Sequence, residues 1–74
     1  MFNFGMHLKK MRLSKGLTQK QLAEGTGLSI RGIQNYELGL RLPTYEILIA
    51  LADYFDVSLD YLVGRSDEPK SSMC

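Results

Sequence analysis

Cysteine and histidine are almost absent from this sequence, which contains one of each in 74 residues. The single cysteine, Cys74, has no disulfide partner within the chain, and a chain without a disulfide framework is typical of a reducing cytoplasm. A structural metal site usually has about four ligands, mostly cysteine and histidine. We therefore expect no metal site, no cofactor, a cytoplasmic location, and His7 on the surface.

Long apolar runs are missing as well. No stretch of the sequence is long enough to span a bilayer, and the first ten residues lack the basic-then-apolar order of a secretory signal peptide. We therefore expect no contact with a membrane. No histidine, cysteine or carboxylate stands in an arrangement typical of catalysis, so we do not expect an enzyme.

What the sequence does contain is typical of one small globular domain. Hydrophobic residues make up 45% of the chain, which argues against disorder. Because the core of such a short chain is small, we expect close helical packing or a dimer partner to contribute to its stability. We expect the domain to occupy residues 1–66, followed by a flexible tail of disordered composition at residues 67–74.

The central stretch, residues 17–39, predicts two short helices joined by a tight turn. Thr18 and Gln21 have the spacing of a capping box, in which each side chain accepts a hydrogen bond from the other residue's backbone. Gly25 and Gly27 are expected to end this first helix, since glycine adopts the left-handed conformation without steric cost. Two short helices joined by such a turn form a helix-turn-helix, whose second helix enters the DNA major groove.

Apolar spacing predicts three further helices, over residues 4–15, 44–55 and 58–64 including their caps and stops. The chain is therefore expected to be all-α with five helices. The expected N-caps of the third to fifth helices are Ser29, Thr44 and Ser58. The expected inward-facing side chains are Phe4, Leu8, Met11, Leu22, Ala23, Ile33, Tyr36, Leu48, Leu51, Ala52 and Phe55.

The charges are unevenly distributed along the chain. The net charge is only +1, which alone does not indicate a nucleic-acid-binding protein. Residues 1–41, however, contain seven lysines and arginines against two glutamates, whereas residues 42–74 contain two against six acidic residues. A basic half of this kind is suited to face phosphate while the acidic half faces away.

The sequence from Leu8 to Gly64 resembles the phage-repressor-like family, that of λ repressor and Cro. The resemblance implies a compact five-helix λ-repressor-like domain that binds double-stranded DNA. It further implies a transcriptional regulator, expected to be a repressor, that binds a two-fold symmetric operator as a homodimer. A restriction–modification controller protein, or an antitoxin-type module whose main partner is another protein, remains the alternative. The matching positions are Arg12, Gly16 to Gln19, Leu22, Ala23, Gly27, Ser29, Ile33, Glu37, Gly39, Pro43, Leu48, Leu51, Ala52, Val57, Ser58 and Leu62.

The resemblance also assigns DNA contacts to particular residues. Arg31 and Asn35 correspond to base-contacting positions, and their side chains suit guanine and adenine, respectively. Ile30 is expected to contact a thymine methyl group, and Gln34 a base or a phosphate. Phosphate contacts, which position a protein without specifying sequence, are expected at Thr18, Gln19, Ser29 and Arg41.

Arg12 and Glu37 occupy positions where the family has a buried ion pair between the first and third helices. An arginine can bind a carboxylate through two parallel hydrogen bonds, which would fix the angle of the third helix. Two separate surface charges are the alternative. Gly32 departs from the family pattern, because relatives usually have a larger residue at this position of the third helix.

The last two predicted helices contain more apolar residues than one inward face requires. An exposed apolar cluster usually marks an interface, and relatives of this family often form dimers through these helices. Packing within the monomer is the alternative. The expected interface residues are Ile47, Tyr54, Tyr61 and Val63.

Overall fold

Each helix in the part of the chain that the structure describes, residues 2–65, begins after a short polar side chain. Thr18 Oγ1 accepts a hydrogen bond from the Gln21 N–H at 3.0 Å, and Gln21 Oε1 accepts one from the Thr18 N–H at 2.9 Å. The predicted capping box is therefore confirmed. Asn3, which the sequence analysis did not identify, caps the first helix. The predicted caps Ser29, Thr44 and Ser58 accept the same kind of hydrogen bond.

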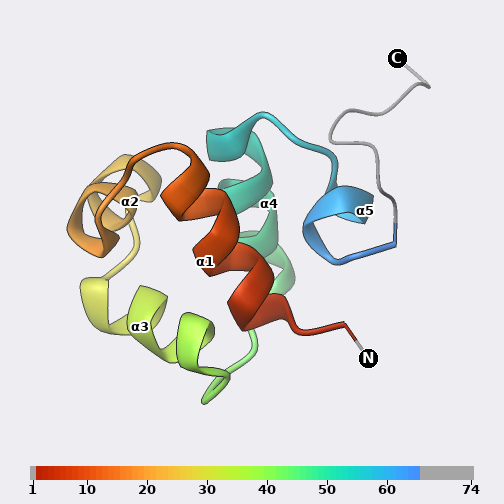
Figure 1. Ribbon diagram of the computed structural model, residues 1–74, viewed down its shortest axis with the longest axis horizontal. Helices are drawn as coiled ribbons and strands as arrows, with labels where there is room; N and C mark the ends of the chain where they lie inside the picture. Colours follow the sequence, from red (N-terminus) through yellow and green to blue (C-terminus); the bar gives the residue numbers. More distant parts are fainter. Residues whose placement is uncertain (1, 66–74) are drawn as a thin grey trace.

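Residues 2–65 of the computed structural model form five helices arranged around one core (Figure 1), so the predicted all-α fold is confirmed. Helix α1 crosses the centre of the view, with α4 behind it and α2 and α3 to one side. None of the described helices combines the length and apolarity needed to cross a membrane. The predicted tail at 67–74 lies outside the described residues. The helices are α1 (Phe4–Ser14), α2 (Gln19–Thr26), α3 (Ile30–Leu38), α4 (Tyr45–Phe55) and α5 (Leu59–Leu62).

The end of α2 differs from the prediction at one position. Gly27 does cap the helix in the left-handed conformation, with φ of 77°. Gly25, expected to help end α2, instead lies inside it, and the ring of Tyr54 from α4 packs against it. A Cβ atom at Gly25 would overlap that ring, so this glycine makes room for a contact between two helices and does not form the turn.

The core is built from side chains of all five helices. Most of the predicted inward face is buried, although Phe4, Tyr36 and Leu48 are only partly buried at its edge. Leu62, on the short helix α5, has no exposed surface, and the prediction omitted it. The buried apolar side chains are Leu8, Met11, Leu22, Ala23, Ile33, Leu51, Ala52, Phe55 and Leu62.

His7 packs between the N-terminal residues and α5 instead of lying free on the surface as expected. Its ring centroid lies 5.3 Å from that of Phe2 and 5.1 Å from that of Tyr61. Burial lowers the pKa of His7, a hydrogen bond with the Tyr61 backbone raises it, and the charge of Lys10 lowers it. The net lowering favours the neutral ring, which is consistent with a packing role.

Gly5 allows α1 to pack directly against the backbone of α3. It is buried, and a Cβ atom at this position would lie 2.5 Å from the carbonyl oxygen of Glu37 and 2.6 Å from that of Tyr36. Because these neighbours are backbone atoms near the end of a helix, they cannot move aside as a flexible side chain can. Any larger residue would therefore push the two helices apart.

We expect Gly5→Ala to lower the free energy of unfolding by roughly 1–3 kcal/mol, the usual cost of overpacking, although alanine is the better helix former. Gly32→Ala is the matched control, because Gly32 is also helical and a Cβ there would meet only two side chains, Ser29 Oγ at 3.0 Å and Tyr36 Cε2 at 3.8 Å. Urea denaturation measures both variants. Equal stability of the two variants would contradict the proposed backbone contact.

Candidate nucleic-acid interface

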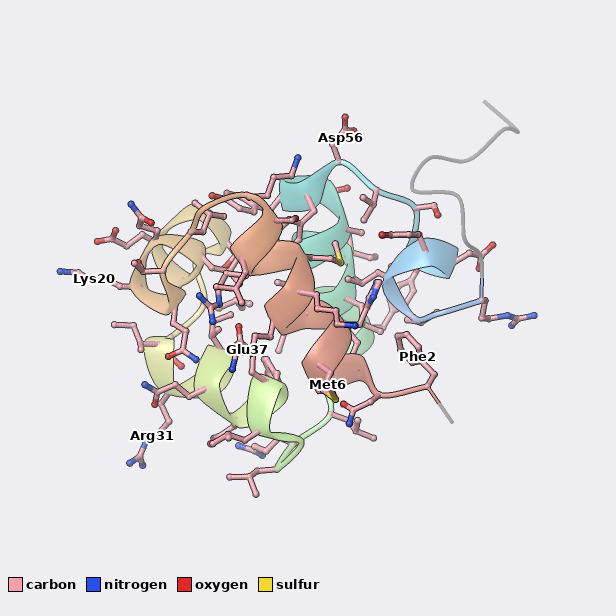
Figure 2. All side chains as sticks on the ribbon, viewed as in Figure 1. Phe2, Met6, Lys20, Arg31, Glu37 and Asp56 are labelled. Atoms are coloured by element: carbon pink, nitrogen blue, oxygen red, sulfur yellow. The ribbon has the colours of Figure 1, made fainter. Side chains whose placement is uncertain are left out.

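The exposed side of α3 brings together the four residues expected to contact bases. Arg31, Gln34 and Asn35 are neighbours on the helix surface because they are three and four positions apart, and Ile30 lies one turn before Gln34. Ile33 faces the opposite way and is fully buried. Figure 2 shows Arg31 pointing away from the body of the protein. This surface contains a cation, two amides and an apolar side chain, which is the chemistry that base edges in the major groove accept.

A buried ion pair holds α3 against α1. Arg12 Nε donates to Glu37 Oε2 at 2.7 Å, and Arg12 Nη2 donates to Glu37 Oε1 at 3.1 Å. The third guanidinium nitrogen, Nη1, donates to the carbonyl oxygen of Leu17 at 2.8 Å, in the turn before α2. Only 9% of the Arg12 side chain and 4% of the Glu37 side chain are exposed, so the two residues are not separate surface charges.

The contacts of Arg12 favour its charged form. The hydrogen bond to Glu37 raises the pKa of Arg12, burial opposes that shift, and the charge of Glu37 adds to it. Arg12 therefore stays charged at neutral pH, directly opposite the carboxyl group of Glu37. Figure 2 shows Glu37 between α1 and α3, where the pair joins the two helices.

Gln19 participates in the same network, which the sequence analysis did not foresee. Its Nε2 donates to Glu37 Oε1 at 3.1 Å, so the first residue of α2 is attached to the end of α3. An amide has two hydrogens, and this bond uses one of them. The other hydrogen remains available, so a phosphate contact by Gln19 stays a prediction and is compatible with this geometry.

The other expected phosphate contacts surround the base-contacting surface. Ser29 caps the start of α3, and Arg41 lies in the loop beyond its end; both are exposed. Thr18 Oγ1 accepts the capping hydrogen bond, which leaves its hydroxyl hydrogen free to donate. Figure 2 shows Lys20 and Arg31 pointing outward on the side of α2 and α3, whereas Asp56 lies at the far end of α4. Lys20 and Arg31, from the basic half of the sequence, thus lie on the side of the molecule that presents α3.

Several of the residues expected at the dimer interface also pack against other residues of the same chain. Ile47 and Tyr61 pack against the core, and the Tyr54 ring packs on Gly25 and edge-on against Phe55, which leaves 38% of Tyr54 exposed. This packing accounts for part of their apolar character, and their role in an interface stays a prediction. Val63 borders an apolar hollow of about 240 Å³. The other residues that line this hollow are Phe2, Phe4, Leu42, Pro43 and Leu48.

Sequence reasoning missed the most exposed apolar side chains. Leu38, Leu40, Leu42 and Tyr45 are between 67% and 82% exposed, and they extend from the last residue of α3 to the first residue of α4. The alternation of leucines in the printed sequence, LGLRLP, was the available signal. Among residues 2–65, no group of three or more histidines, cysteines and carboxylates is placed to hold a metal ion.

The chain belongs to the helix-turn-helix family, whose profile matches residues 8–62. It is 46% identical over 66 residues to the uncharacterized HTH-type transcriptional regulator YqaE of Bacillus subtilis (strain 168). That alignment covers 88% of this chain and 57% of the relative. The chain likewise spans little more than half the length of other curated relatives, at 55% in two further cases.

Two solved structures place this fold among the phage-repressor-like domains, which confirms the resemblance. The P22 c2 repressor, solved in complex with a synthetic operator, matches with a TM-score of 0.81 and 26% identity over 89% of this chain and 100% of that one. The restriction–modification controller protein C.AhdI from Aeromonas hydrophila matches with a TM-score of 0.77 and 32% identity over 81% of this chain and 91% of that one.

We expect Arg12→Met to lower the free energy of unfolding by roughly 3–5 kcal/mol, because Glu37 would remain buried without a counterion. Glu37→Leu should have a similar effect, and the double variant should recover part of the loss. Urea denaturation of the four proteins in a double-mutant cycle measures the coupling. Arg31→Met, at an exposed arginine, is the control and should change stability little. Simple additivity of the two single substitutions would show that the pair is not coupled.

Proposed function

We propose that this chain is a sequence-specific DNA-binding transcriptional regulator, a repressor, that inserts α3 into the major groove of double-stranded DNA. The observation that carries this proposal is the combination of a rigidly held helix and an exposed polar face. The Arg12–Glu37 pair fixes α3 from the inside, while its outer side presents an exposed Arg31 and a half-buried Asn35. A major groove about 12 Å wide accommodates one α-helix.

The comparisons support a regulator without separating its subclasses. The similarity to a repressor bound to its operator and the similarity to a controller protein are close in TM-score, at 0.81 and 0.77. We therefore propose the role that these proteins have in common, binding of DNA to regulate transcription, in the cytoplasm where DNA is accessible. No observation on the described residues favours a module that acts through another protein instead.

We also propose that the protein binds a two-fold symmetric operator as a homodimer. Half-sites in this mode of recognition lie one helical turn, about 34–36 Å, apart. The domain measures 34 × 26 × 23 Å, so two copies on one face of the DNA would be close enough to touch. We propose that the contact includes the expected residues Ile47, Tyr54, Tyr61 and Val63, together with the neighbouring Leu42 in the apolar hollow.

The proposed function predicts different effects for two exposed arginines. Arg31→Ala should lose roughly 1–3 kcal/mol of binding free energy on an operator selected from a random pool, with little change on scrambled DNA, because it contacts a base edge. Arg41→Ala should weaken binding to both DNAs alike and reduce the slope of log affinity against log salt by about 0.9 for each bound protomer, as expected for a phosphate contact. Fluorescence anisotropy on both DNAs at several salt concentrations distinguishes these patterns. An equal loss on both DNAs for Arg31→Ala would mean that α3 does not read sequence through this residue.

The proposed dimer should be visible in sedimentation velocity at micromolar concentration. Leu42→Glu should shift the protein toward monomer without unfolding it, since this side chain is 82% exposed. Leu13→Glu on α1, at a side chain that is 56% exposed and outside the proposed interface, is the matched control and should leave the dimer intact. A wild-type protein that remains monomeric even with operator DNA would contradict the proposed homodimer.

A further inference from the structure

A hollow of about 690 Å³ lies between α1, α2 and α3, beside the base-contacting surface. Gln34 of α3 and Gln19 of α2 both line it. Gln34 therefore belongs to two surfaces, because it also neighbours Arg31 on the exposed side of α3. The hollow is thus continuous with the face that would enter a major groove, on the side of α3 that faces α1.

The electrostatics of this hollow depend on one residue. Arg12 and Glu37 form its inner wall, and their charges neutralise each other through two hydrogen bonds. Lys9 of α1 also lines the hollow, and it forms no ion pair with any other residue in the range 2–65. The wall therefore has a net charge of about +1, which is located on an exposed and mobile ammonium group.

The two lysines of α1 and Lys15, the residue that caps its end, face different sides of the molecule, although they are close in sequence. Consecutive residues of a helix are rotated by about 100°, so Lys9 and Lys10 cannot share a direction. Lys10 borders a separate hollow, next to Phe2 and His7. Lys15 borders another one, next to Phe55 at the end of α4. Only Lys9 among these three lines the hollow beside α3.

We propose that this hollow receives a phosphate of the DNA backbone and that Lys9 is the cation that binds it. The inference rests on the proposed function, because it requires α3 to lie in the major groove. The phosphates that border a groove about 12 Å wide then run along both sides of α3. On the side that faces α1, the backbone passes the mouth of the hollow, where the amides of Gln19 and Gln34 can donate hydrogen bonds to the same phosphate oxygens.

The test compares Lys9→Gln with Lys10→Gln, which remove the same charge from adjacent positions of one helix. Both lysines are exposed, so both variants should unfold at the wild-type temperature. Binding to a random-sequence duplex is measured by fluorescence anisotropy between about 50 and 200 mM salt. For each bound protomer, Lys9→Gln should reduce the salt slope by about 0.9 and the affinity at 0.1 M salt roughly tenfold, as expected for loss of one phosphate contact. Lys10→Gln should keep the wild-type slope, and Lys9→Arg should restore it.

The outcomes separate this inference from the function on which it rests. If the wild type binds the duplex and Lys9→Gln either keeps the wild-type slope or changes it no more than Lys10→Gln does, then Lys9 is not a phosphate ligand and the inference is overturned. The proposed function would stand in that case. If the wild type binds no DNA at any salt concentration, the proposed function fails, and this inference fails with it.

Discussion

The buried ion pair between Arg12 and Glu37 is the interaction on which the candidate interface depends. Its charges contribute little net stability, because the cost of removing them from water offsets much of their attraction. The pair instead restricts the relative orientation of α1 and α3, since two parallel hydrogen bonds between planar groups require a defined geometry. Two further hydrogen bonds, from Arg12 to the Leu17 carbonyl and from Gln19 to Glu37, extend this constraint to α2.

Close packing at two glycines also helps to position the helices. Gly5 brings the start of α1 against the carbonyl groups at the end of α3, and Gly25 allows α4 to approach α2 through Tyr54. The side chains on the outer side of α3 take no part in these contacts between the described helices. Residues on the outer side of α3 can therefore change without disturbing the contacts that orient the helix.

The fold was largely predictable because its signals are local. A capping side chain acts on a backbone group three residues away, and a left-handed glycine ends a helix wherever it stands, so the caps at Thr18, Ser29 and Ser58 could be identified from spacing alone. The ion pair was different. Arg12 and Glu37 are 25 positions apart, and only the resemblance to a known family suggested that they meet.

The sequence by itself determined the class of fold, the position of each helix start, and the polar character of the outer side of α3. Only the tertiary structure decided that Gly25 serves a helix contact, that His7 is packed against Tyr61, and that Lys9 rather than Lys10 faces the hollow beside α3. The physical reason is that helical periodicity predicts which residues lie on the same face of a helix. Which other residues that face contacts depends on the angle between the helices. That angle is set by contacts between residues far apart in the chain.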